Sequence, residues 1–542
     1  MSSKQRTEER TIQTKDTSQE SSSRPKGLLG VIEWLGNKLP DPFWLFVILG
    51  ILVLISSWIG EHLGMSAMNP STEEEVHVEN LLSAEGFHKI FTEAVNNFIS
   101  FPPLGLILTV MLGIAVAEHS GLIGAAMRGV VNKVSPKTLT FTVALLGVTG
   151  SIASDAVYVI LIPLGAAAFK QMGRSPVVGA MVAFAASSAG FNASLILNIT
   201  DVLLAGISTS AASMIDPEYE VGALANYFFV IPSAIVLALI ITVVTELFMY
   251  RRTHELVDHD DVDYEAASFT RPTASHEDEE DVESEDVELT LQPHEKRGMR
   301  WASVVSIVVL AAYFAFLFIP GSPMRGEGGS IIQSPLITGV AVAITVFFLA
   351  AGIAYGLGAG TISSGKDVPE FMAEGLKTLL PMLVLFFVVA QFIAYFSWSN
   401  LGTWTAIKGS ELLTHLDLPH PVLFLCFVLL VAVLNLLITS GSAQWALMAP
   451  IIVPMMLLVG VSPEVSQMLF RIGDSPTNII TPMSPYFALA LTFLQRYHKN
   501  AGVGTLMSLA IPYSVSMLLG WFVFFLVWYF LGIPLGPGVP IR

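Results

Sequence analysis

Long apolar segments, separated by short polar stretches, recur along most of the chain. A helix needs about 20 predominantly apolar residues to cross the hydrocarbon core of a bilayer. Nine segments meet this requirement, and we expect each of them to form a membrane-spanning helix. They are residues 41–60, 104–124, 177–200, 225–250, 301–320, 335–356, 378–397, 465–494 and 503–532.

Two further apolar regions, 139–172 and 421–460, are each interrupted near the middle by a Gly-Ser pair. The interruptions read VTGSIASD around Gly150 and ITSGSAQW around Gly441. Each half is too short to cross a membrane alone, so we predict two re-entrant helical hairpins. Exposed backbone at a hairpin tip is tolerated at this depth only where it faces protein or a water-filled cavity.

The two predicted hairpins resemble each other in sequence. GSIASDAVYVILIP starts at Gly150 and GSAQWALMAPIIVP starts at Gly441, and each places a proline thirteen residues after its glycine. A shared pattern in two oppositely oriented halves indicates an inverted repeat, whose binding site lies near the bilayer midplane between hairpin tips and interrupted helices. The alternative is a chance likeness between two stretches rich in Gly, Ser and Pro.

Basic residues collect in alternate loops, which predicts how the chain is threaded through the membrane. With the N-terminus in the cytoplasm, the four loops assigned to the outside hold only Lys89, Arg325 and Lys408. One of these outside loops is 201–224. This threading places the first hairpin entering from the cytoplasm, the second entering from outside, and the C-terminus outside.

Composition agrees with this pattern, since 53% of the 542 residues are apolar and only 13% are charged. A soluble domain carries about 25% charged residues, so we predict an all-α polytopic membrane protein. The formal net charge of −17 is concentrated in one place, because residues 254–290 hold fifteen Asp or Glu against one Arg. Such a segment is predicted to be a solvated linker; a regulatory or partner-binding role is the alternative.

These features divide the chain into four parts. They are a cytoplasmic tail with the entry to the first span (1–40), a first membrane half with hairpin 139–172 (41–250), an acidic cytoplasmic linker (251–300), and a second membrane half with hairpin 421–460 (301–535). The sequence has no metal-binding cluster, phosphate-binding glycine loop, nucleophile elbow or basic nucleic-acid patch. We therefore expect neither an enzyme nor a nucleic-acid-binding protein.

Four charged residues fall at bilayer depth: Asp155, Asp201, Arg471 and Asp474. A charge there costs about 2.5–3.5 kcal/mol on insertion scales and is retained mainly where it pairs, faces a cavity or has a function. Arg471 and Asp474 stand three residues apart, so a purely structural ion pair on one helix face is possible. The SPTN that follows breaks the helix, which favours a functional site.

The stretch RIGDSPTNIITP offers two kinds of ligand. The oxygens of Asp474, Ser475, Thr477 and Asn478 suit a small alkali cation, whereas Arg471 and exposed N–H groups suit a carboxylate. A matching first-half stretch, SSAGFNASLILNITD at 187–201, supplies further buried polar side chains: Ser187, Ser188, Asn192, Asn198 and Asp201. Trp445, at the second hairpin tip, is predicted to stack on a flat substrate; the alternative is an interfacial tryptophan.

Several motifs resemble the AbgT family of bacterial transporters. They are SIASDAVYVILIPL (151–164), NITDVLLAGIS (198–208), SGSAQWALMAPIIVPM (440–455) and RIGDSPTNIITPMSPYF (471–487). The resemblance implies a homodimer in the bacterial inner membrane, each protomer having nine spans and two hairpins. Family members are described as importing p-aminobenzoyl-glutamate or exporting sulfonamide antimetabolites, driven by an ion gradient.

The resemblance also implies particular residues. The family's substrate-binding positions fall on Asp201, Ser442, Trp445, Pro463, Arg471, Asp474 and Pro482. A sodium site would use Asp474 and Asn478, with Asn435 as a further ligand. The tail at 1–27 and the linker at 252–297 lie outside the resemblance.

The expected function is therefore ion-coupled secondary transport of an aromatic carboxylate, such as p-aminobenzoyl-glutamate, or export of a sulfonamide. No cofactor is expected, apart from Na⁺ as a candidate coupling ion. A dicarboxylate or Na⁺/H⁺ carrier of similar repeat architecture remains an alternative. An ion channel that uses the same hairpins to line a filter is another. The direction of transport is left open.

Overall fold

The computed structural model describes residues 40–68, 74–153, 156–256, 290–499 and 501–542. The N-terminal tail up to residue 39, Asp155 and most of the acidic linker lie outside the described residues. Helices dominate the described part, which confirms the predicted all-α class. Its two short strands, β1 (Ser66–Met68) and β2 (Glu75–His77), pair antiparallel with Ser66 opposite His77.

Within the described ranges, eight helical stretches are long and apolar enough to cross a membrane. One of them is α19 (Gly441–Leu458), an arm of the second predicted hairpin, and the others coincide with predicted spans. The helices at these spans are α2 (Pro42–His62), α4 (Pro102–His119), α10 (Tyr227–Val244), α12 (Pro293–Phe318), α14 (Val340–Ala359), α16 (Leu380–Trp398) and α22 (Val503–Leu531). Large apolar side chains such as Ile307 on α12 point outward, as expected of a lipid-facing surface.

The two remaining predicted spans are interrupted. The first consists of α8 (Pro176–Ala189) and α9 (Ile199–Ala212), and the second of α20 (Pro463–Asp474) and α21 (Pro485–Tyr497) with a 3₁₀ turn, η5 (Ser475–Ile480), between them. The prediction that residues 201–212 belong to an outside loop is wrong. These residues form α9 because Asn198 and Asp201 make a reciprocal capping box that restarts the helix.

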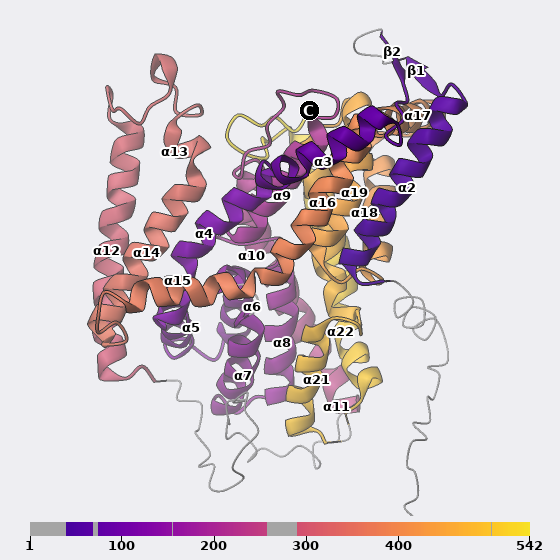
Figure 1. Ribbon diagram of the computed structural model, residues 1–542. Helices are drawn as coiled ribbons and strands as arrows, with labels where there is room; N and C mark the ends of the chain where they lie inside the picture. The colour runs from indigo at the N-terminus through magenta and orange to yellow at the C-terminus, as the bar shows by residue number, and fades with distance from the viewer. Residues whose placement is uncertain (1–39, 69–73, 154–155, 257–289, 500) are drawn as a thin grey trace, which may run out of the picture.

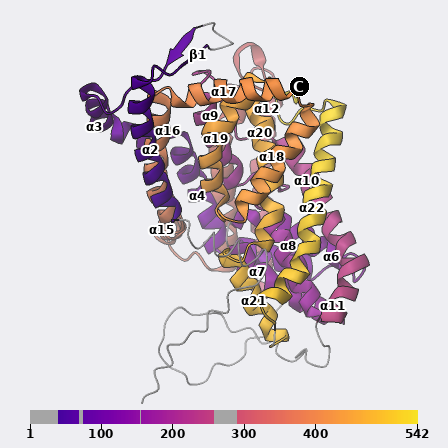
Figure 2. The same cartoon turned by 90° about the vertical axis from the view of Figure 1, so that its right-hand side faces the viewer.

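Both predicted hairpins break where the Gly-Ser pairs stand. The first contains α6 (Leu139–Thr149), a 3₁₀ turn η1 (Gly150–Ala153) and α7 (Ala156–Gln171), and the second contains α18 (His420–Asn435) followed by α19. Figures 1 and 2 place the first hairpin in the lower half of the molecule and the second in the upper half. Opposed hairpins are the arrangement that an inverted repeat predicts, while their re-entry from a membrane surface stays a prediction.

Several helices lie in segments that the apolar pattern left as loops. Apart from residues at their ends, these are α3 (Ala84–Ile99), α5 (Leu122–Val131), α11 (Tyr250–Leu256), α15 (Asp367–Thr378) and α17 (Leu401–Leu416), with a 3₁₀ turn η4 (Glu327–Gly329). The short helix α13 (Pro335–Thr338) and the π-helical turn η2 (Thr245–Met249) instead fall inside predicted spans. Helices α3 and α15 are amphipathic, so a search for continuous apolar runs overlooks them. Figure 1 shows α15 running across the molecule rather than along its long axis.

The ends of the described segments agree with the predicted threading. Figure 1 shows α11 and the start of α12, which flank the acidic linker, at the lower face, while the C-terminus lies at the upper face. Which of these faces meets the cytoplasm stays a prediction.

The first hairpin packs tightly on the first interrupted helix through two glycines. A Cβ atom added to Gly179 on α8 would lie 2.4 Å from the carbonyl oxygen of Gly165 on α7, and one added to Gly165 would lie 2.8 Å from that of Gly179. Real Cβ atoms do not approach backbone this closely. Glycine at both positions therefore allows the close approach of α7 in the first hairpin to α8 in the first interrupted helix.

We expect Gly179→Ala to lower the unfolding free energy by about 1–3 kcal/mol, because the added methyl overpacks this contact. The matched control is Gly105→Ala on α4, where an added Cβ meets no atom within 4 Å. Alanine is the better helix former, so the control should be neutral or stabilising. Thermal unfolding in detergent measures both, and a Gly179→Ala variant as stable as the control would contradict this packing role.

Candidate substrate and ion site

The tips of the two hairpins meet at one cavity of about 280 Å³, here called the central cavity. Its wall includes Ser151 from the first tip and residues 439–442 from the second. Ser187 and Phe191, at the interruption between α8 and α9, also line it. Small-molecule sites span roughly 300–1,000 Å³, so the central cavity has about the size needed for a compact solute.

A buried ion pair joins the two halves beside this cavity. Arg471 Nη1 on α20 donates to Asp201 Oδ1 on α9 at 2.5 Å, and the two side chains are 1% and 4% exposed. The alternative of a local Arg471–Asp474 pair is therefore wrong. Asp201 is held in place because its Oδ2 accepts from the backbone N–H of Asn198 at 2.9 Å. Asn198 in turn donates to Ser151 Oγ at 3.0 Å, which ties the pair to the first hairpin tip.

Asp474 lies against the second hairpin tip. Its Oδ2 accepts from Asn192 Nδ2 at 2.5 Å, whereas its Oδ1 has no hydrogen-bond partner among the described residues. A Cβ added to Gly441 would lie 2.9 Å from Asp474 Oδ2 and 2.7 Å from the Phe191 ring. The tip backbone thus reaches the carboxylate because residue 441 has no side chain.

Oxygen atoms converge on the amide of Asn435, at the end of α18. Its Nδ2 donates to the Asp474 carbonyl at 2.8 Å, to Thr477 Oγ1 at 2.8 Å and to Asn478 Oδ1 at 3.1 Å. The Oδ1 atom of Asn435 is buried and, in the part of the chain that the structure describes, has no partner. Three oxygens around one point, with two further unpaired oxygens on Asp474 and Asn435, form a donor set that suits a hard cation.

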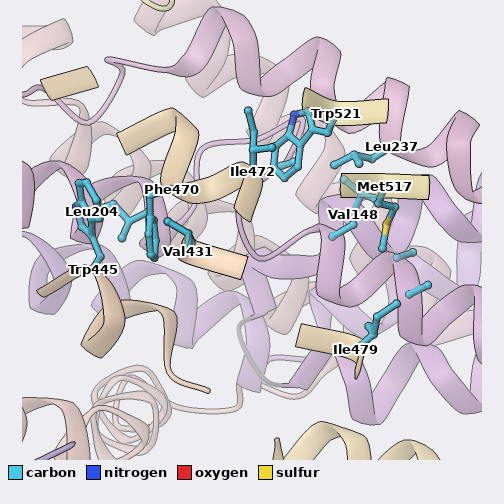
Figure 3. Packing of buried hydrophobic residues seen from close by; sticks show 14 of the residues in the cluster. Val148, Leu204, Leu237, Val431, Trp445, Phe470, Ile472, Ile479, Met517 and Trp521 are labelled. Atoms are coloured by element: carbon cyan, nitrogen blue, oxygen red, sulfur yellow. The ribbon is translucent and has the colours of Figure 1, made fainter. Parts of the chain in front are cut away.

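Trp445 packs inside the protein rather than on the cavity wall. The side chain is fully buried, its Nε1 donates to Ser208 Oγ at 3.1 Å, and its ring lies 4.7 Å from that of Phe470, centroid to centroid. Figure 3 shows the two rings facing each other beside Leu204. In this conformation no face of the indole borders the central cavity, so the predicted stacking on substrate finds no support there.

The remaining predicted substrate residues are spread along the site. Ser442 lines the central cavity. Pro463 is the first residue of α20, eight residues before Arg471, which corresponds to about 12 Å along a helix. Pro482 follows η5 and is partly exposed. The structure therefore brings Asp201, Arg471, Asp474 and Ser442 around the hairpin tips and leaves Pro463 at the far end of its helix.

Sequence reasoning missed Gln467, which stands one helical turn before Arg471. With its amide oriented to satisfy its neighbours, Gln467 donates to Ser208 Oγ at 2.8 Å and accepts from Arg471 Nη2 at 3.1 Å. Ser208 also accepts from Trp445, so a hydrogen-bonded chain runs from the tryptophan to the arginine. The i, i+4 spacing of two polar residues on a buried helix is the signal that could have identified it.

Broken helices and buried charges around a cavity between two opposed hairpins are typical of secondary transporters. Comparison with known proteins agrees, because the profile of the AbgT transporter family matches residues 27–542. The chain belongs to the AbgT family. It is thus a multi-pass membrane transporter rather than an enzyme.

Three relatives give this assignment detail. The p-aminobenzoyl-glutamate transport protein of Escherichia coli K12 is 36% identical over 521 residues, which cover 96% of this chain and 98% of the relative. The crystal structure of the YdaH transporter of Alcanivorax borkumensis has a TM-score of 0.83 at 39% identity, covering 92% of this chain and 100% of that one. MtrF of Neisseria gonorrhoeae, described as illuminating a class of antimetabolite efflux pumps, has a TM-score of 0.85 at 40% identity, with 95% and 100% covered.

We expect Asp201→Asn to lower the unfolding free energy by about 3–5 kcal/mol, because Arg471 is left as a buried charge without a counter-charge. The side-chain oxygen of an asparagine at position 201 can still accept from the backbone N–H of Asn198, so the lost stability reports the ion pair. Removing both charges with Asp201→Asn and Arg471→Gln should cost less than the sum of the single losses.

Thermal unfolding of the detergent-solubilised protein measures these variants. The control is Lys408→Met, which breaks the exposed Lys408–Glu411 pair and should cost at most about 1 kcal/mol. Strictly additive losses at Asp201 and Arg471 would show that the two charges do not stabilise each other.

Proposed function

We propose that this protein is an ion-coupled secondary transporter of the bacterial inner membrane for an aromatic carboxylate such as p-aminobenzoyl-glutamate. The single observation that carries the proposal is the central cavity, where both hairpin tips meet next to two buried carboxylates and a buried arginine. The solute class is taken from the curated relative in Escherichia coli. Export of a sulfonamide is the second candidate, favoured by the likeness to MtrF.

The carboxylate of the solute would bind at the second hairpin tip. Helix α19 begins there, and Ser440 caps it by accepting from the backbone N–H of Ala443 at 3.4 Å. The N-terminus of a helix offers unpaired N–H groups and a partial positive charge, both of which favour an anion. The hydroxyls of Ser440 and Ser442 line the same wall of the cavity. Arg471 keeps an Nε without a partner among the described residues, although its charge is already paired with Asp201.

The coupling cation would bind between Asp474, Asn435 and Asn478. The Asn435 Nδ2 now occupies the point on which the three oxygens converge. Moving that amide off the point would leave room for a cation among the three oxygens, and the Oδ1 atom of Asn435 would then be a further oxygen ligand. The carboxylate of Asp474 would supply the negative charge that a sodium ion needs.

Transport then follows from differential affinity. A ligand shifts the balance between inward-facing and outward-facing states only as far as it binds one state better than the other. Binding of the solute at the second hairpin tip would change the contacts between that tip and Asp474. Solute and cation would therefore both act on the position of this tip. The functional unit would be a homodimer, as the family resemblance implies.

We expect Asp474→Asn to abolish the ion-stimulated part of transport while the protein stays folded. Asparagine keeps the shape of the side chain and an oxygen to accept from Asn192, but it removes the charge that would hold the cation. The measurement is uptake of labelled p-aminobenzoyl-glutamate, and separately of a labelled sulfonamide, into liposomes under an imposed sodium gradient or an imposed proton gradient.

The control for this experiment is Asp417→Asn, which neutralises an exposed carboxylate at the end of α17 and should transport like the wild type. Ion-stimulated uptake at the wild-type rate in the Asp474→Asn variant would remove Asp474 from the coupling mechanism. Ion flux that does not saturate with solute would instead indicate a channel.

A further inference from the structure

A pair of tyrosines on the wall of the central cavity has no role in the function described so far. Tyr158 on α7 and Tyr486 on α21 stack face to face, with ring centroids 4.2 Å apart and an angle of 3° between the planes. Both side chains line the central cavity. They are 328 residues apart in the chain, so the fold brings them together only where the first hairpin meets the second interrupted helix.

The central cavity has a polar wall and an aromatic wall that come from different helices. Its hydroxyl-bearing wall includes Ser440 and Ser442 of the second hairpin, whereas its aromatic wall is formed by the stacked tyrosines. Figures 1 and 2 place α19 in the upper half of the protein and α7 and α21 in the lower half. A solute with a charged group at one end and a ring at the other would match both walls.

Tyr486 is the tyrosine that can accept a further ring. Tyr158 is only 5% exposed and has Phe184 as a second aromatic neighbour, with ring centroids 6.3 Å apart. Tyr486 is partly exposed and stands one residue after the proline that opens α21. Its ring stacks on Tyr158, and the residue borders the central cavity. Trp445, by contrast, is fully buried against Phe470 and does not reach the wall.

We propose that the stacked pair Tyr158–Tyr486 is the aromatic recognition element of the transporter, with the ring of the solute extending the stack at Tyr486. The inference rests on the proposed function, since it assumes an aromatic carboxylate as solute. Offset-stacked rings attract each other beyond what their buried area alone provides. The tyrosine pair then selects solutes that carry a planar ring, while the second hairpin tip binds their carboxylate.

The test compares two labelled probes on the purified full-length protein by equilibrium binding. One is p-aminobenzoyl-glutamate, and the other is cyclohexanecarbonyl-glutamate, which keeps the carboxylates and the approximate bulk but has no π face. We expect Tyr486→Leu to weaken binding of the aromatic probe by about two- to tenfold, with little change for the cyclohexyl probe. Tyr486→Phe should bind both probes as the wild type does, because it keeps the ring.

Tyr158→Leu should also weaken binding of the aromatic probe, because the Tyr486 ring loses the ring on which it stacks. The matched control is Phe318→Leu, which breaks the stacked pair Phe314–Phe318 on α12, away from the central cavity, and should leave binding of both probes unchanged. Thermal unfolding checks that each variant is folded. Comparing probe binding by Tyr486→Phe and Tyr486→Leu separates the effect of the ring from the effect of changing residue 486.

The possible failures are distinguishable. If the wild type binds neither probe, the proposed function is wrong and this inference falls with it. A second outcome is that the wild type binds the aromatic probe while Tyr486→Leu weakens binding of both probes equally, or of neither. In that case the solute class stands and the tyrosine pair is not the recognition element. Loss of the aromatic preference in Trp445→Leu with retention in Tyr486→Leu would assign recognition to the tryptophan instead.

Discussion

The site depends on the ion pair between Asp201 and Arg471, because breaking a buried pair leaves an uncompensated charge inside the protein. The two residues come from opposite halves of the chain, on α9 and α20, and each stands next to a helix interruption. Asp201 also caps its own helix and, through Asn198, reaches Ser151 at the first hairpin tip. One electrostatic contact thus connects a broken helix of each half to a hairpin.

Around that contact, the polar groups divide into two sets with different chemistry. The oxygens near Asp474, Asn435 and Asn478 suit a cation, while the helix N-terminus at Ser440 suits an anion. The tip of the second hairpin lies between them, touching Asp474 on one side and lining the central cavity on the other. Under the proposed function, a cation and an anionic solute bound this close to each other would reinforce each other's binding.

Local sequence signals predicted the helix breaks well. Helices end before Gly-Ser at Gly150 and before Ser-Pro after Asp474, whereas Gly-Ser at Gly441 begins α19 after the break that follows Asn435. These signals depend on adjacent residues only, and the structure confirms a helix break at each of the three places. The partner of Arg471 could not be predicted, because nothing within one sequence relates it to a carboxylate 270 residues away. Trp445 was also ambiguous, since a tryptophan at a hairpin tip looks the same whether it faces a cavity or packs on Phe470. The amphipathic helices α3 and α15 lack the continuous apolar run that identified the spans.

The glycine at position 441 has a consequence for how water reaches the site. Main-chain atoms of the hairpin tip lie against Asp474, and they fit because Gly441 has no Cβ. Glycine has no side chain that could rotate aside, so at this point only withdrawal of the tip itself would bring water to the carboxylate. Backbone displacement of this kind is slower than side-chain rotation.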